Sequence, residues 1–274
     1  MTWSRVAIVP SSADRRDLVA SAMFASGAGG VHEDGQSFVT HLPGASDAPA
    51  FVARVRAADE DLEASITPVE ETDWSESWRD RIHAHELGAL TVAPPWLADG
   101  RDPATTIVIE PAMAFGTGEH ATTRGVVRLM QDVIRPGDAV ADLGAGSAVL
   151  AIAAAKLGAA RCFAIEYDHD AIGNAEENVA RNGVGDRVVV LEGDASAFLP
   201  LVAPVRVVLA NIISSVLTDL LPVIALSLAD DGVVILSGIL QDERPRMLEV
   251  LASGGWRVEA EDAEDEWWSV RVSQ

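Results

Sequence analysis

Acidic and glycine residues at the ends of two expected strands are the clearest candidates for chemistry in this sequence. An apolar strand ends at Asp142, and the chain then turns through Gly144 and Gly146 into a helix. Glycines in such a turn let the backbone approach a ligand closely, and the first amides of the helix favour polar or anionic groups. Glu166 ends the next strand, where a carboxylate can accept both hydroxyls of a ribose. These residues predict a nucleoside ligand at the carboxyl edge of a parallel sheet.

The spacing within this turn separates two kinds of nucleoside. A dinucleotide fingerprint has a third glycine inside the helix, at the position that Val149 occupies here. A carboxylate at Asp142 would also lie unfavourably close to a pyrophosphate. The form D-x-G-x-G-S is used instead by enzymes that bind S-adenosylmethionine, whose cationic sulfonium suits an acidic strand end. We therefore predict S-adenosylmethionine rather than a dinucleotide.

Two further strand ends carry polar side chains that would face the same edge. Asp194 follows the third strand, where its side chain would accept from the adenine amino group or cap the following helix, and both roles remain open. Asn211 ends the fourth strand among apolar neighbours and would face the methyl-donor side. A buried asparagine needs hydrogen-bond partners, which favours a ligand or substrate role.

The elements that must position these residues begin near residue 105. From there to residue 274 apolar strands alternate with helices, a pattern typical of a parallel sheet covered on both faces. The last two strands, 256–265 and 266–274, follow one another without a helix and predict an antiparallel edge. The fold class is therefore α/β, with a mostly parallel, Rossmann-like sheet.

The first part of the chain predicts a separate small domain. Residues 1–68 have the order β-α-β-β-α-β, which is the split βαβ plan of ferredoxin-like α+β domains. Residues 69–104 are expected to form a connector, with helical spacing in its first part and three prolines in its second. Residues 105–274 would then form the ligand-binding domain.

Composition excludes several classes of partner and site. The net charge is −22, from 42 acidic and 20 basic residues, so we expect no direct binding of nucleic acid. No apolar run is long enough to cross a membrane, and no secretory leader is visible at the start of the chain. The single cysteine, Cys162, excludes an intrachain disulfide and a cysteine-rich zinc site and fits a reducing cytoplasm. We expect no metal, a cytoplasmic protein, and an oligomeric state that the sequence leaves open and that is compatible with a monomer.

The runs EPAMAFGTGEHATTRG, ADLGAGSAVLAIAAAKLGA, ANIISSVL and EWWSVRV resemble the PrmA family of ribosomal-protein methyltransferases. The resemblance implies a seven-stranded class I methyltransferase sheet that binds S-adenosylmethionine, with residues 1–68 as the substrate-recognition domain. Matched position by position, it implies cofactor contacts at Thr123, Gly144, Glu166 and Asn211. Beside them we expect contacts from Gly146 and Asp194, and Phe115 could provide an apolar wall near the sulfonium.

The resemblance also implies the acceptor. In the family the accepting groups are lysine side chains and the α-amine of a basic ribosomal protein, large-subunit protein eleven. The amine must lose a proton, but no residue identifies itself as the base. His120 could accept that proton or could hold its own loop by hydrogen bonds. Glu119, and Ala148 in place of a further glycine, depart from the family pattern.

Three other functions are compatible with parts of the pattern. A methyltransferase of the same fold could use another protein or a small molecule as acceptor. A non-catalytic module could hold a nucleoside without turnover, although the loop glycines and the ribose acid argue against it. A dinucleotide-dependent oxidoreductase is disfavoured by the loop spacing around Val149.

Overall fold

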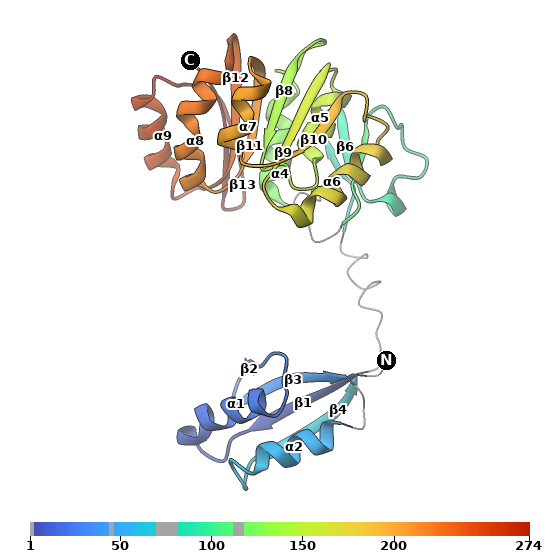
Figure 1. Cartoon of the computed structure of the whole chain (residues 1–274), viewed down its shortest axis with the longest axis vertical. Coiled ribbons are helices and arrows are strands. Elements are labelled where there is room, and N and C mark those ends of the chain that lie inside the picture. Colours follow the sequence, from blue (N-terminus) through green and yellow to red (C-terminus); the bar gives the residue numbers. More distant parts are fainter. Residues whose placement is uncertain (1–2, 44–46, 70–81, 112–117) are drawn as a thin grey trace. The chain divides into compact units, whose positions relative to one another are not determined.

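The computed structural model describes residues 3–43, 47–69, 82–111 and 118–274. The chain divides into two compact units, Met1–Arg81 and Ile82–Gln274. Within the described ranges no helix is long and apolar enough to cross a membrane. Those ranges also contain no cluster of three or more metal-type side chains. Figure 1 shows the elements of each unit.

The first unit is an antiparallel sheet with two helices on one face. The sheet has the order β2-β3-β1-β4, which is the ferredoxin-like arrangement expected from the sequence. Its apolar core joins Val6 and Ile8 of the first strand to Met23 of the first helix and Phe51 of the second. The bounds are β1 Trp3–Val9, a 3₁₀ turn Ala13–Arg15, α1 Arg16–Ala25, β2 His32–Asp34, β3 Ser37–Pro43, α2 Ala48–Arg56 and β4 Glu63–Val69.

The second unit contains the predicted seven-stranded sheet, in the order β10-β9-β8-β11-β12-β14-β13. The first five strands of this order run parallel, and β14 pairs antiparallel with both β12 and β13, which confirms the antiparallel edge. The strands are β8 Ala139–Leu143, β9 Arg161–Glu166, β10 Val188–Glu192, β11 Val205–Asn211, β12 Leu228–Leu240, β13 Arg257–Glu264 and β14 Trp267–Ser273.

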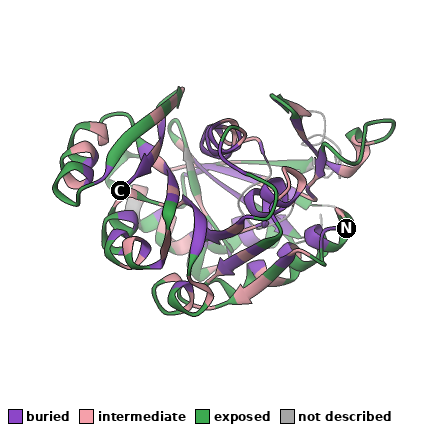
Figure 2. Cartoon of the chain, turned by 90° about the horizontal axis from the view of Figure 1, so that it is seen from above, coloured by how far each residue is buried: buried purple, intermediate pink, exposed green. Residues whose placement is uncertain are grey.

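Helices cover both faces of this sheet. The core on one face takes its side chains from α4, α5 and α6, and the core on the other face from α7, α8 and α9. Figure 2 shows the buried residues along the strands and the inner sides of the helices. Cys162 lies in the first core and is 1% exposed, so its thiol is a packing group. The bounds are α4 Ala121–Met130, α5 Val149–Lys156, α6 His169–Arg181, α7 Ala195–Val202, α8 Ser214–Ser227 and α9 Arg244–Ser253.

Two local predictions were wrong. The first part of the expected connector, residues 69–104, was predicted to be helical. From residue 85 onward it instead forms two strands of a small sheet with the order β5-β6-β7. Its strands are β5 His85–Leu87, β6 Leu90–Ala93 and β7 Thr106–Val108, and a 3₁₀ turn spans Pro95–Leu97. The pairing of β6 with β7 outweighs the local helical spacing, and a short window of sequence cannot detect that pairing. The helix α7 was not predicted, although parallel β10 and β11 require a crossover of this kind.

Candidate functional site

The strand order places one crevice at the carboxyl edge of the seven-stranded sheet. Strands β8 and β11 are neighbours, although β9 and β10 come between them in the sequence. Open α/β sheets bind their ligands where the strand order reverses in this way. Asp142 lies near the end of β8 and Asn211 is the last residue of β11, so both lie at the predicted edge.

The glycine turn after β8 has the backbone conformation that its sequence predicts. Gly144 and Gly146 have φ angles of +66° and +52°, in the left-handed region that glycine tolerates. A Cβ on Gly144 would lie 3.1 Å from the Ile212 side chain, so a larger residue would crowd the loop after β11. The amides of Gly144 and Ala145 donate to the carbonyl of Ile165, at 2.9 and 3.1 Å. The turn is therefore attached to the end of β9.

Ala148, which departs from the family pattern, has a backbone conformation that favours glycine. It is buried, it is the N-cap of α5, and its φ angle is +62°, a conformation that costs an alanine about 1–2 kcal/mol. A glycine here would avoid that cost.

We expect Ala148→Gly to be less destabilising than Ala145→Gly by about 1–2 kcal/mol in urea unfolding. Both variants remove a buried methyl group and loosen the unfolded chain, but only Ala148 has a positive φ angle. The difference between them therefore isolates the backbone strain. Equal free energies of unfolding for the two variants would contradict this explanation.

The carboxylate of Glu166 is held in place by two backbone amides. Its Oε2 accepts from the Gly146 N–H at 2.7 Å, and its Oε1 accepts from the Asp168 N–H at 2.8 Å. Each oxygen has a further lone pair that can accept from another donor. The structure thus joins Glu166 to the glycine turn at the predicted edge, and the two amides orient its carboxylate.

A hollow of about 540 Å³, here called the first hollow, lies over the ends of β8, β9 and β10. Its lining includes Gly144, Ile165, Glu166, Tyr167, Gly193, Asp194, Ile212, Val216 and Asp219. Asp194 caps α7, since its Oδ1 accepts from the Ser196 N–H at 2.7 Å and the Ser196 hydroxyl at 2.6 Å. These hydrogen bonds hold the pKa of Asp194 below its usual range. Its place in the lining and its capping role are compatible, because one carboxylate oxygen serves the cap.

Asp142 is a buried carboxylate at the base of the glycine turn. It is 1% exposed, and its Oδ2 accepts from the Ala151 N–H at 3.0 Å. Its Oδ1 is buried and has no hydrogen-bond partner among the residues that the structure describes. Burial raises the pKa of Asp142 to about 7, and the charge of Glu166 adds to the rise. A partly ionised carboxylate below the turn fits a cationic nucleoside such as S-adenosylmethionine and opposes a diphosphate.

Asn211 contacts the first turn of α4. Its Nδ2 donates to the hydroxyl of Thr123 at 3.5 Å, and Thr123 is fully buried as the third residue of α4. The structure therefore brings together two predicted residues that are far apart in the sequence. Phe115, which was also predicted to line the site, lies outside the described residues.

His120 has the hydrogen bonds of a helix cap. Its Nδ1 accepts from the Thr122 N–H at 3.4 Å and lies 2.7 Å from the Thr122 hydroxyl. A ring nitrogen that accepts an N–H bond carries no proton, so the proton of the neutral ring is on Nε2. Burial lowers the pKa of His120, the charge of Arg124 lowers it further, and Glu266 partly opposes both. His120 is therefore neutral at neutral pH and offers an N–H donor rather than a base.

A second hollow, of about 570 Å³, adjoins the first and shares Asp219 with it. Its lining includes Ile213, Ser214, Thr218, Gly238, Glu243 and Trp267. The ring centroids of Trp267 and His120 lie 4.9 Å apart, in an edge contact. Trp268 is buried on the other face and donates to Glu261 at 2.7 Å. Of these two tryptophans, Trp267 thus faces the site, because successive side chains of a strand point to opposite faces.

Several lining residues were missed by sequence reasoning. Ile212 and Val216 are apolar, and neither Tyr167 nor Asp219 belongs to a motif that indicates a ligand. A usable signal was present in position alone: residues just after each strand of the crevice line the ligand site in sheets of this type.

Comparison with protein families places these features in a known group. The family model for Ribosomal protein L11 methyltransferase (PrmA) matches residues 18–274. The ribosomal protein L11 methyltransferase of Thermus thermophilus is 36% identical over 252 residues, or 92% of each chain. That of Pelotomaculum thermopropionicum is 38% identical over 74% of this chain and 66% of its own length. The matched region thus spans about two thirds of this second relative.

A solved structure shows the same architecture. It is a crystal structure of a ribosomal protein L11 methylase from Lactobacillus delbrueckii subsp. bulgaricus, which superposes with a TM-score of 0.62 at 30% identity. The superposition covers 70% of this chain and 99% of the solved chain.

Proposed function

The chain belongs to the ribosomal protein L11 methyltransferase family, and from that premise we propose that it transfers methyl groups from S-adenosylmethionine to amines of the large-subunit ribosomal protein L11. The observation that carries the proposal is the pair of adjoining hollows at the strand-order reversal. One hollow is lined by the glycine turn and Glu166, and the other opens beside Trp267. This arrangement suits a donor and an acceptor that meet at one edge.

We assign the first hollow to S-adenosylmethionine. Glu166 would accept from the ribose hydroxyls, and Asp194 lies where it could accept from the adenine amino group with the oxygen that does not cap α7. Gly144 and Gly146 let the backbone approach the cofactor. We propose that Thr123 and Asn211, which contact one another at the end of β11, lie at the methyl-donor side. When bound, S-adenosylmethionine supplies a methyl group on an already activated sulfonium.

The contribution of the protein is then mainly alignment and exclusion of water. The Asn211–Thr123 contact fixes the end of β11 against α4, and Trp267 and His120 form a wall beside the second hollow. Because His120 is neutral with its proton on Nε2, we propose that it orients groups and that solvent takes the proton of the amine. The carboxylates of Asp219 and Glu243 in the second hollow favour a cationic acceptor side chain.

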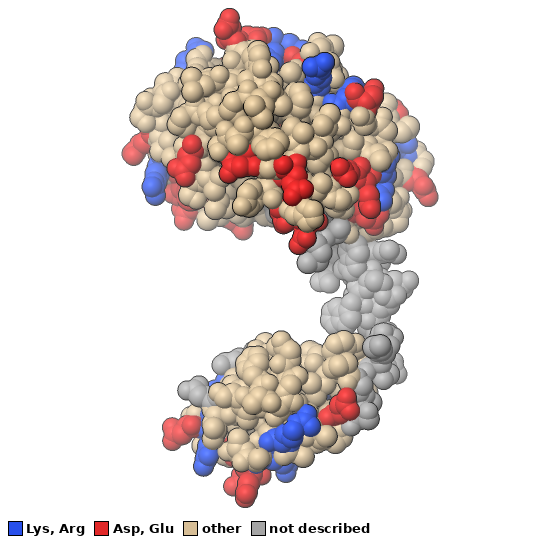
Figure 3. Space-filling model, in the orientation of Figure 1, with Lys and Arg blue, Asp and Glu red and all other residues tan. Residues whose placement is uncertain are grey.

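The surface charge supports a basic substrate. Figure 3 shows acidic side chains along the lower part of the second unit, with few basic ones between them. A net charge of −22 attracts a basic protein and speeds its encounter.

We expect isothermal titration calorimetry to show micromolar binding of S-adenosylmethionine and no binding of NAD. The carboxylate of Asp142 below the glycine turn favours a cation and opposes a pyrophosphate. This is the physical reason for the difference. Binding of NAD alone would overturn the assignment of the first hollow.

The acceptor needs a separate experiment. Purified ribosomal protein L11 incubated with the enzyme and S-adenosylmethionine should gain mass in steps of one methyl group, which mass spectrometry detects. Methylation of other proteins but not of L11 would favour a different acceptor on the same fold. Binding without any turnover would favour a nucleoside-binding module.

A further inference from the structure

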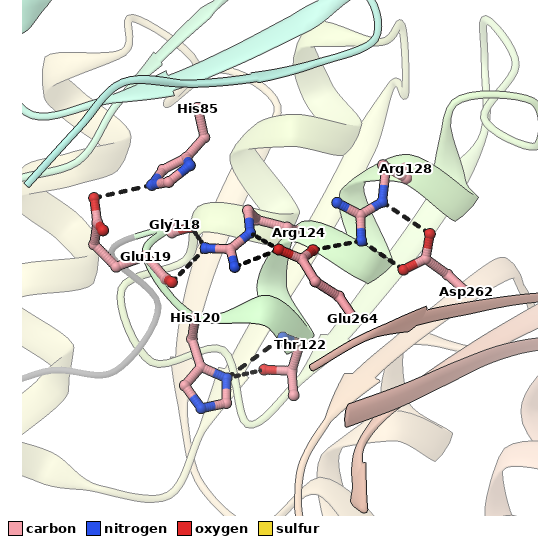
Figure 4. A network of polar contacts seen from close by, with 9 residues as sticks. All are labelled: His85, Gly118, Glu119, His120, Thr122, Arg124, Arg128, Asp262 and Glu264. Carbon is pink, nitrogen blue, oxygen red and sulfur yellow. Dashed lines mark hydrogen bonds and ion pairs between the residues drawn. The ribbon is translucent and has the colours of Figure 1, made fainter. Parts of the chain in front are cut away.

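Arg124 links the loop before α4 to the C-terminal hairpin of strands β13 and β14. Its Nη1 donates to the carbonyl of Gly118 at 3.4 Å and, in a shorter bond, to that of Glu119. Its Nε and Nη2 donate to Glu264 on β13, at 2.9 and 2.6 Å. Figure 4 shows this one guanidinium between the loop and the strand. The hydrogen bond from Arg124 is the main cause of the lowered pKa of Glu264, so the pair is ionic at neutral pH.

Glu119 attaches the other side of the same loop. Its Oε1 accepts from the His83 N–H at 2.9 Å and lies 3.0 Å from His85 Nε2. His83 and His85 belong to the first residues of the second unit, so the loop is also held by the segment through which the chain enters that unit. Glu119 had no expected role in the sequence, and it departs from the family pattern.

The helix that carries Arg124 packs closely against the hairpin. A Cβ at Gly125 would lie 2.5 Å from Ser269 Oγ and 3.2 Å from Asp262 Oδ1, so α4 packs directly against β13 and β14. Arg128, one turn after Arg124, binds Asp262 at 2.5 and 2.8 Å and Glu264 at 2.8 Å. Within the described part of the chain, Arg128 makes no hydrogen bond to residues 118–120 (Figure 4). Arg128 thus holds the helix to the same strand without holding the loop.

We propose that Arg124 and Glu119 are positioning residues for methyl transfer, because they clamp residues 118–120 between the hairpin and the first strand of the unit. Neither lines either hollow, so they act through residues 118–120 of the loop and through Thr123 in the first turn of α4. The clamp keeps His120 against Trp267 and Thr123 against Asn211. This inference rests on the proposed function for its kinetic consequence, but not for its structural one.

The kinetic test compares Arg124→Gln with Arg128→Gln, a matched change on the same helix. Both variants lose a pairing with β13 and should lose similar thermal stability, but only Arg124→Gln releases the loop. We expect kcat to fall about 10- to 100-fold in Arg124→Gln, because small misplacements near reacting groups have effects of that size. In Arg128→Gln we expect kcat within about threefold of the wild type. Arg124→Lys, which can serve only one side of the clamp, should be intermediate.

Hydrogen–deuterium exchange tests the clamp without activity. The amides of Thr123 and Arg124 donate to the carbonyl of His120, at 3.1 and 3.3 Å. They should exchange faster in Arg124→Gln and in Glu119→Ala than in the wild type or in Arg128→Gln, all without cofactor. Glu119→Gln keeps an oxygen for the His83 N–H and should exchange at an intermediate rate.

The outcomes separate this inference from the proposed function. Equal losses of kcat and equal exchange rates in Arg124→Gln and Arg128→Gln would show that Arg124 only stabilises the fold, and would overturn the inference. A wild-type enzyme that exchanges as expected but methylates nothing would instead overturn the proposed function and leave the clamp supported.

Discussion

Replacing Asp142 by asparagine is expected to raise the free energy of unfolding by about 2–4 kcal/mol at pH 8 and to leave it nearly unchanged at pH 5. The carboxyl group is fully buried, and burial raises its pKa to about 7 from a usual value of 3.8. Each unit of such a shift corresponds to about 1.4 kcal/mol, and an unsatisfied amide of the asparagine offsets part of the gain.

The sign follows from the proton balance. Between pH 4 and about 7 the folded protein binds a proton at Asp142 that the unfolded chain does not, so stability falls as pH rises through this range. Asparagine carries no titrating group and removes this dependence. Urea unfolding of both proteins at pH 5, 6, 7 and 8 measures the difference, in which the other titrating groups cancel.

Asp138, at the start of the same strand, provides the control. Although burial opposes its ionisation, hydrogen bonds from Arg206 hold its pKa below the usual value, with atoms 2.6 and 2.7 Å apart. Asp138→Asn leaves Arg206 buried without its ionic partner and should lose about 3–5 kcal/mol. Its loss should not vary between pH 5 and 8, because a lowered pKa acts only below that range. A difference between Asp142→Asn and the wild type that stays constant with pH would refute the assignment of a raised pKa to Asp142.

Replacing Glu166 by alanine is expected to weaken binding of S-adenosylmethionine about 100-fold or more. The carboxylate lines the first hollow and is oriented by the amides of Gly146 and Asp168. A charged hydrogen-bond partner contributes about 1.5–3 kcal/mol, so two contacts with a ribose account for an effect of this size. Isothermal titration calorimetry gives the dissociation constants, and Glu166→Gln, which keeps one acceptor, should be intermediate.

Glu192 is the matched control for Glu166. It ends the neighbouring strand β10 in direct register with Glu166, but it is exposed, and its side-chain partner among the described residues is the exposed His169, at 3.1 Å. Glu192→Ala should change the affinity less than twofold. Equal losses in both variants would point to the general negative field of this edge, and no loss in Glu166→Ala would remove it from the cofactor site.

The same residues show how far sequence reasoning reached. The alternation of apolar strands and helices predicted the parallel sheet and its antiparallel edge, because side-chain periodicity is a local property, and the family resemblance predicted the number of strands. Gly144, Gly146 and Glu166 could be placed together because each follows a strand end, and parallel strands bring those ends to one edge. Local spacing failed at β5 and β6, where pairing with β7 decides the conformation.

The sequence alone predicted the fold class, a nucleoside-type ligand and the family resemblance, since these depend on residue type and on spacing along the chain. Only the tertiary structure decided the burial of Asp142 and the contacts of His120, Glu119 and Arg124. The raised pKa of Asp142 comes from burial by the turn and α5, and the neutral cap at His120 comes from its Thr122 bonds and its burial. The loop clamp depends on Glu264 and His85, which lie far from Arg124 and Glu119 in the sequence. Burial and contacts between distant segments exist only once the chain is folded, so no reading of neighbouring residues could supply them.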